Sequence, residues 1–252
     1  MSGECDACVA AGSTVYDCQT LHSGIEERVG DMDVYTVGEG TTAVILGYDI
    51  FGFKIANARS NCDTLASAGQ YMVCMPDFFR GESASNFKEF TIDAIKQLIQ
   101  DCGQYQQVKR DLQEHILPYL SGKGVTKFLW IGFCWGGKIA LDIAADEGLG
   151  PSFKACGGVH AALKEPEEMV CQKALATNCP LMFLQAVNDA DVRPLAEALD
   201  TTALKEKHMV RTFYDMQHGW CGARGDRSIP KIAAAVKATL QMSLDFFHES
   251  LS

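Results

Sequence analysis

The sequence lacks the features that mark exported and membrane-embedded proteins. No apolar run approaches the roughly 20 residues that a membrane-spanning helix needs. The first residues are small and acidic, without the basic stretch and apolar run that define a signal peptide. Internal repeats and low-complexity segments are absent as well. We therefore expect a cytoplasmic globular protein with no membrane partner.

Positive charge is also in short supply. The chain has 22 Lys and Arg against 32 Asp and Glu, which gives a net charge of -10 and a pI of about 5.0. A chain this acidic repels the phosphate backbone of nucleic acids and anionic membrane surfaces. We therefore expect a small-molecule partner, no nucleic-acid partner, and a monomer or weak homodimer.

Cysteine, by contrast, is abundant, with an odd count of 11 in 252 residues. Disulfide frameworks belong to short secreted chains, so these thiols are expected to be reduced and to behave mostly as small core hydrophobes. Cys5 and Cys8, with Cys18 and His22 nearby, leave a metal-binding or thiol-redox function open. Because a single C-x-x-C pair is weak evidence for a zinc site, we predict no metal and no cofactor.

Short apolar runs alternate with helical patterns along most of the chain. This alternation is typical of a mostly parallel sheet covered by helices on both faces, and it predicts an α/β fold. We expect a Cys-containing extension packed on the domain (residues 1–30) and a single domain (residues 31–252). The predicted strands are 33–37, 42–46, 71–75, 128–132, 157–160, 181–186 and 210–214, and the predicted helices are 55–68, 91–120, 135–146, 194–207 and 229–251.

The strongest local signal is the segment Gly132-Phe133-Cys134-Trp135-Gly136, which joins a predicted strand to a predicted helix. It has the pattern of a nucleophile elbow with cysteine in place of serine. Side chains two residues before and after the nucleophile would collide in so sharp a turn, which explains both glycines. The turn places the thiol at a helix N-terminus, which favours the thiolate. The alternative is a buried structural cysteine in a glycine-rich turn.

An acid and a histidine follow later predicted strands. Asp189 and Asp191 come after strand 181–186, and His218 comes after strand 210–214. Each residue has a plain structural alternative, namely helix capping for the aspartates and an ordinary loop position for the histidine. Together, however, they follow the cysteine in the order nucleophile, acid, histidine that α/β-hydrolases use.

Five segments together resemble the dienelactone hydrolase family, the carboxymethylenebutenolidase-like α/β-hydrolases. The resemblance extends over roughly residues 30 to 248 and implies the α/β-hydrolase fold. The matching segments are GYDIFG at 47–52, MPDFFRG at 75–81, GFCWGG at 132–137, NDADV at 188–192 and HGW at 218–220.

The resemblance also implies a Cys–His–Asp triad. Cys134 corresponds to the nucleophile, His218 to the base and Asp189 to the acid that orients the histidine, since the family places a valine three residues after its acid and Val192 fits. Asp191 is the reserve acid.

The family further implies an oxyanion hole built from two backbone N–H groups. The corresponding residues are Ile50, in the loop after the third strand, and Trp135, directly after the nucleophile. Such donors contribute about 3 kcal/mol each to transition-state stabilisation.

Substrate contacts are expected from five further positions. Asp49 stands where bacterial relatives usually have glutamate, and Arg80 and Arg224 are the nearest matches to the family's substrate-binding arginines, although their spacing is offset. His160 follows a predicted strand, and Trp220 is expected in an aromatic pocket wall.

The sequence therefore predicts a cysteine-dependent hydrolase of a small lactone, ester or thioester that works through a thioester acyl-enzyme. Two alternatives stay open. One is a non-catalytic α/β-hydrolase relative that binds a ligand or partner, and the other is a thiol-redox or metal-binding protein that uses the N-terminal cysteines.

Overall fold

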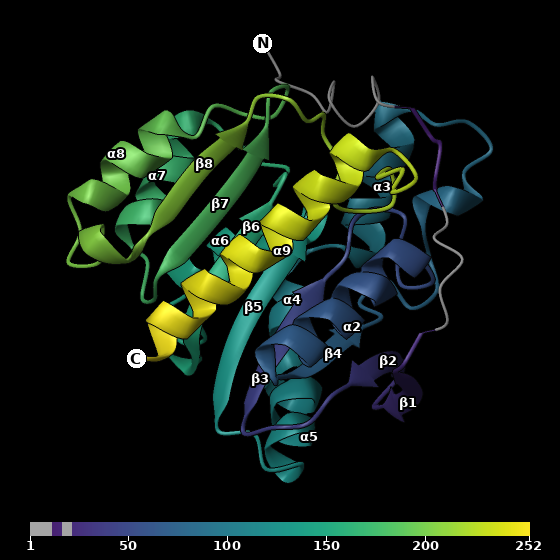
Figure 1. Ribbon diagram of the computed structural model, residues 1–252, viewed down its shortest axis with the longest axis horizontal. Helices are drawn as coiled ribbons and strands as arrows, with labels where there is room; N and C mark the ends of the chain where they lie inside the picture. The colour runs from purple at the N-terminus through teal and green to yellow at the C-terminus, as the bar shows by residue number, and fades with distance from the viewer. Residues whose placement is uncertain (1–11, 17–21) are drawn as a thin grey trace.

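A computed structural model describes residues 12–16 and 22–252 (Figure 1). In this part of the chain, eight strands form one sheet in the order β1-β2-β4-β3-β5-β6-β7-β8. The strands are β1 (Ile25–Val29), β2 (Met32–Val37), β3 (Thr42–Gly47), β4 (Met72–Pro76), β5 (Lys127–Phe133), β6 (Phe153–Val159), β7 (Leu181–Ala186) and β8 (Met209–Phe213).

The six strands from β3 to β8 run parallel to one another, whereas β2 runs antiparallel to both of its neighbours, β1 and β4. Because parallel strands need long crossovers, helices cover both faces of the sheet. The predicted α/β-hydrolase fold is confirmed. The helices are α2 (Ala56–Gly69), α3 (Ile92–Cys102), α4 (Tyr105–Asp111), α5 (Leu117–Gly122), α6 (Trp135–Ala145), α7 (Glu167–Leu175), α8 (Arg193–Asp200) and α9 (Pro230–Leu251).

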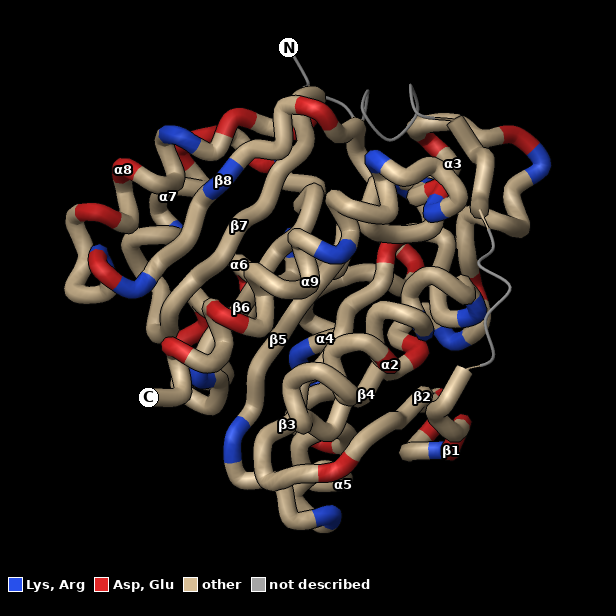
Figure 2. Tube along the Cα trace, in the orientation of Figure 1, with Lys and Arg blue, Asp and Glu red and all other residues tan. Residues whose placement is uncertain are grey.

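The helices α2 and α9 pack against each other on one face of the sheet, and α6 packs on the opposite face (Figure 1). The strands β3, β4 and β7 contain no charged residue, as expected for strands covered on both sides (Figure 2). None of the helices within the described ranges combines the length and the apolarity that a membrane crossing requires.

Two elements of the structure were not predicted from the sequence. The edge strand β1 was not predicted, because three of its five residues are charged and it pairs only with β2. It lies within residues 1–30, so part of the expected extension belongs to the sheet. The helix α7 was also not predicted, and it packs against α6 and α8.

The predicted helix at 91–120 is broken into several pieces. It consists of α3, α4, a π-helical turn (Leu112–Ile116) and α5. Gly103 caps the C-terminus of α3, and its N–H donates to the carbonyl of Ile99. Short 3-10 turns lie at Ala84–Asn86, Gly150–Ser152 and Lys205–Lys207.

Candidate active site

Cys134 lies between the end of β5 and the start of α6, in an unusual backbone conformation. Its φ is 53° and its ψ is -107°, a region that residues with a side chain rarely adopt. A Cβ on Gly132 would lie 1.8 Å from the carbonyl oxygen of Gly136, and a Cβ on Gly136 would lie 2.2 Å from that of Gly47. The two glycines therefore permit the close packing that holds the turn.

The thiol of Cys134 lies beside the imidazole of His218. The distance from Sγ to Nε2 is 3.2 Å, and on the other side of the ring Nδ1 lies 2.5 Å from Oδ1 of Asp189. The side chains of His218 and Asp189 are each only 2% exposed. The structure thus brings the three predicted residues into one buried hydrogen-bonded line.

The loops after β7 and β8 hold this line in place. Asp189 accepts a hydrogen bond from the N–H of Ala186 through Oδ2, at 2.6 Å. The side-chain oxygen of Asn188 accepts one from the N–H of His218, at 2.8 Å. The alternative acid, Asp191, is exposed and binds Arg193. Of the two acids considered, Asp189 is therefore the one beside the histidine.

A cavity of about 240 Å³ opens beside the thiol. Ile50 and Trp135, the two predicted oxyanion-hole residues, both border it together with Cys134. The N–H of Gly136 donates to the carbonyl of Tyr48, which ties the loop after β3 to the elbow. The complete lining is Ile50, Ile95, Ile99, Cys134, Trp135, Lys138, Ala162, Lys164 and Glu165.

Asp49 braces two loops. Its Oδ1 accepts from the N–H of Phe51 at 3.0 Å, and its Oδ2 accepts from the N–H of Ala223 at 2.8 Å. Burial raises the pKa of the Asp49 carboxyl, and the two N–H donors oppose that effect. The carboxylate thus links the loop after β3 to the loop that carries His218.

His160 lies at the end of β6 with a φ of 37°. Its buried ring packs edge-on against His218, at 5.2 Å between centroids, and against Trp220, at 5.0 Å. Neither ring nitrogen has a hydrogen-bond partner among the described residues. Burial, together with the nearby His218, lowers the pKa of the His160 ring well below its usual value, which favours the neutral form. His160 and Trp220 thus form the packing around the imidazole of His218.

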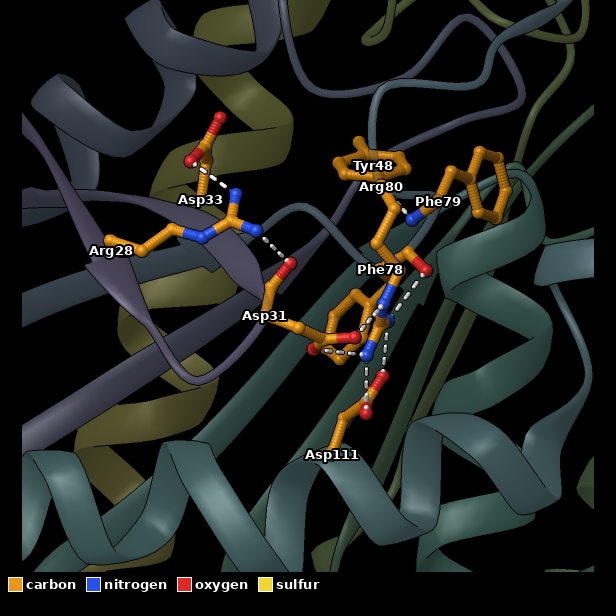
Figure 3. A network of polar contacts seen from close by, with 8 residues as sticks. All are labelled: Arg28, Asp31, Asp33, Tyr48, Phe78, Phe79, Arg80 and Asp111. Atoms are coloured by element: carbon orange, nitrogen blue, oxygen red, sulfur yellow. Dashed lines mark hydrogen bonds and ion pairs between the residues drawn. The ribbon is translucent and has the colours of Figure 1, made fainter.

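Arg80 is not brought to the cavity beside Cys134, contrary to the expected role in substrate binding. Its guanidinium forms a bidentate pair with Asp111, at 2.7 and 2.8 Å, and a second pair with Asp31, at 2.9 and 3.3 Å (Figure 3). It also donates to the carbonyl of Phe78. These contacts engage all five N–H donors of the guanidinium, so Arg80 connects the segment after β4 to β1–β2 and α4.

Arg224 lies close to the histidine loop. Its Nε and Nη2 both donate to the carbonyl of Gly12, at 2.9 and 2.6 Å. The guanidinium lies over the rings of Phe51 and Phe90. A second cavity, of about 480 Å³, is bordered by His218, Trp220 and Arg224. Residues 12–16 therefore pack beside this part of the site.

Two asparagines that the sequence did not single out support the histidine loop. Asn57 donates to the carbonyls of Gly222 and Gly225, and Asn61 donates to the carbonyl of Cys221. Both asparagines are fully buried on α2, more than 150 residues earlier in the chain. The sequence does carry a signal for these residues. Two asparagines fall on the face of the predicted helix that must be buried, and buried polar side chains need hydrogen-bond partners.

Eight cysteines lie in the described part of the chain, and of these Cys134 borders the cavity beside the hydrogen-bonded line. Cys5 and Cys8, on which the metal and redox alternatives depend, lie outside the described residues. Within residues 12–16 and 22–252, no group of three or more His, Cys, Asp or Glu side chains is arranged to hold a metal ion.

Comparisons with known proteins agree with the fold. The model of the dienelactone hydrolase family matches residues 32–251. A carboxymethylenebutenolidase homolog of Homo sapiens is 30% identical over 193 residues, covering 71% of this chain and 70% of the relative. An uncharacterised AIM2 family protein of Schizosaccharomyces pombe is 25% identical, covering 91% and 92%. The crystal structure of a putative dienelactone hydrolase from Klebsiella pneumoniae superposes with a TM-score of 0.65 at 20% identity, covering 88% and 99%. The chain therefore belongs to the dienelactone hydrolase family and, with this fold, is an ester-bond hydrolase.

Proposed function

We propose that this protein hydrolyses a small activated ester, lactone or thioester through a covalent intermediate on Cys134. The observation that carries the proposal is the line of contacts from Sγ of Cys134 to His218 and on to Asp189, at 3.2 and 2.5 Å. A nucleophile, a base within hydrogen-bond reach and a third group that orients the base are the parts that nucleophilic catalysis requires.

In the proposed mechanism, Nε2 of His218 accepts the thiol proton while Asp189 keeps the proton on Nδ1. Sγ of Cys134 attacks the carbonyl carbon, and the N–H groups of Ile50 and Trp135 stabilise the oxyanion. The tetrahedral intermediate collapses, the C–O or C–S bond to the leaving group breaks, and His218 returns the proton to the leaving group. A thioester on Cys134 remains.

The second half of the reaction repeats these roles with water. His218 removes a proton from the water as its oxygen attacks the thioester. The intermediate collapses with loss of the Cys134 thiolate, which takes back the proton from His218. Because a thiolate is a good leaving group, acylation by an ordinary alkyl ester tends to reverse, whereas an enol or aryl alcohol leaving group drives it forward.

Steady-state hydrolysis of p-nitrophenyl acetate tests the proposal. Cys134→Ala and His218→Ala should each lower kcat/KM by roughly 10³-fold or more. Cys171→Ala, which removes a half-buried thiol on α7, is the matched control and should leave turnover unchanged. Wild-type rates in both site variants would overturn the triad and favour a non-catalytic role for this site.

A further inference from the structure

We infer that the cavity beside Cys134 is an acyl pocket for an apolar chain or aryl ring, with Ile95 and Ile99 of α3 setting its size. This inference rests on the proposed function, because it assigns the acyl side of the substrate to a particular part of the same site. It goes further in naming the chemistry of the group that Cys134 receives.

The arrangement of the site separates the acyl group from the leaving group. The cavity is bordered by Cys134 and by the two proposed oxyanion donors, Ile50 and Trp135. His218, which must protonate the leaving group, borders the second cavity together with Arg224. A carbonyl carbon at Sγ, with its oxygen toward the two N–H groups, therefore has its leaving group on the histidine side and its acyl group in the first cavity.

The walls of the first cavity are predominantly apolar. Ile95 is buried and Ile99 is half-buried, one turn apart on α3. Ile50, Trp135 and Ala162 complete the apolar lining. Such walls gain free energy from covering hydrocarbon and offer little to a polar acyl group.

The charged residues at the rim largely neutralise one another. Lys138 pairs with Asp142 at 2.5 Å and with Glu165 at 3.4 Å, and Lys173 bridges the same two carboxylates. Since this group contains two cations and two anions, it provides no excess charge for a substrate carboxylate. Lys164 also borders the cavity, so the experiment includes an anionic substrate.

The volume limits the length of the acyl chain. A cavity of about 240 Å³, at ~30 Å³ for each group the size of a water molecule, holds about eight non-hydrogen atoms.

The wall formed by α3 is connected to the elbow, because Nε1 of Trp135 donates to the carbonyl of Gly103 at 2.9 Å. The pocket is thus held at a fixed distance from the nucleophile.

A series of p-nitrophenyl esters tests the inference with one leaving group throughout. From acetyl to hexanoyl, kcat/KM should rise about three- to fourfold per methylene, the usual effect of burying one CH₂. The mono-p-nitrophenyl ester of glutarate, similar in length to the hexanoyl ester but ending in a carboxylate, should react at least tenfold more slowly than the hexanoyl ester. A flat series, or a faster glutarate ester, would overturn the apolar acyl pocket.

Variants of α3 test which residues set the size. Ile99→Trp should fill the pocket and remove most of the gain in kcat/KM between the acetyl and hexanoyl esters. Gln100→Trp, at an exposed position on the same helix, is the control and should keep the full gain. Equal loss in both variants would contradict the assignment of Ile99.

Cys134→Ala separates this inference from the proposed function. If that variant hydrolyses none of the esters while the wild type shows no dependence on acyl length, the acyl pocket is rejected and the proposed function stands. Persistent hydrolysis in that variant would reject the proposed function as well.

Discussion

The carboxylate of Asp189 lies 2.5 Å from Nδ1 of His218, whereas Asp191, two residues later, binds Arg193 at the surface. The short distance and the burial of both partners favour the tautomer that carries its proton on Nδ1 and leaves Nε2 able to accept the proton of Cys134. The two aspartates therefore have opposite environments despite their closeness in sequence.

This difference predicts that two matched substitutions have very different effects on kcat. Asp189→Asn should lower kcat roughly 10²- to 10⁴-fold, because an amide does not stabilise the imidazolium that forms during attack. Asp191→Asn should leave kcat within about twofold, since it removes only an exposed ion pair. Initial rates with p-nitrophenyl acetate are the measurement, and a large loss for Asp191→Asn alone would reverse the assignment.

Gly132→Ala should lower the free energy of unfolding. A Cβ at this position would lie 1.8 Å from the carbonyl oxygen of Gly136, so the elbow must move. We expect a loss of about 3 kcal/mol in the free energy of unfolding, measured with urea. Gly122→Ala, where an added Cβ meets nothing within 4 Å, should cost less than about 0.5 kcal/mol. Equal stability of both variants would show that the elbow has room for a side chain.

Arg80→Ala should reduce stability without raising KM. The substitution leaves the carboxylate of Asp111, 7% exposed, without its cation, and breaking a buried pair in this way costs about 3 kcal/mol. Arg28→Ala removes a pair with Asp33 that is largely exposed and should cost less than about 1 kcal/mol. Urea unfolding and steady-state kinetics are both needed, because a tenfold higher KM with unchanged stability would restore Arg80 to the substrate site.

The neutral state of His160 makes stability depend on pH. Burial lowers the pKa of its imidazole well below the usual value, whereas the unfolded chain has a pKa of about 6.5. Below pH 6.5 the unfolded state therefore binds a proton that the folded state does not, and stability falls as the pH falls.

Replacing His160 should remove this contribution. Between pH 7 and pH 5.5, wild type should lose about 1 kcal/mol more of its free energy of unfolding than His160→Gln does. The contributions of the other titrating groups to the pH dependence are the same in both proteins and cancel in this comparison. Parallel losses in the two proteins would show that the His160 ring has the same pKa in the folded state as in the unfolded chain.

Much of the site could be predicted from local sequence because its parts follow successive parallel strands. The elbow around Cys134 is marked by its glycines, and the loops with Asp189 and His218 follow β7 and β8 in chain order. The parallel strands in this sheet end at one edge, so residues far apart in sequence meet there.

Other features depended on tertiary contacts that local patterns do not reveal. Arg80 was expected at the substrate because it matches the family's substrate-binding arginines. Its partner Asp111 lies 31 residues away on α4, so no local pattern indicates the pair. The strand β1 escaped notice because an edge strand needs no apolar face of its own. The cavity depends on how α3 meets the elbow, which the helical pattern of 91–120 does not specify.

Graded alkylation of the protein with iodoacetamide tests the central role of Cys134 most directly. Burial raises the pKa of three of the described thiols, those of Cys62, Cys74 and Cys221, and that of Cys221 to about 12. Because the thiolate is the form that reacts, these three cysteines should be alkylated slowly. At each stage, peptide mass spectrometry gives the fraction of Cys134 modified, and p-nitrophenyl acetate hydrolysis gives the activity remaining. The account predicts that the activity lost equals the fraction of Cys134 alkylated; full alkylation of Cys134 with undiminished hydrolysis would contradict it.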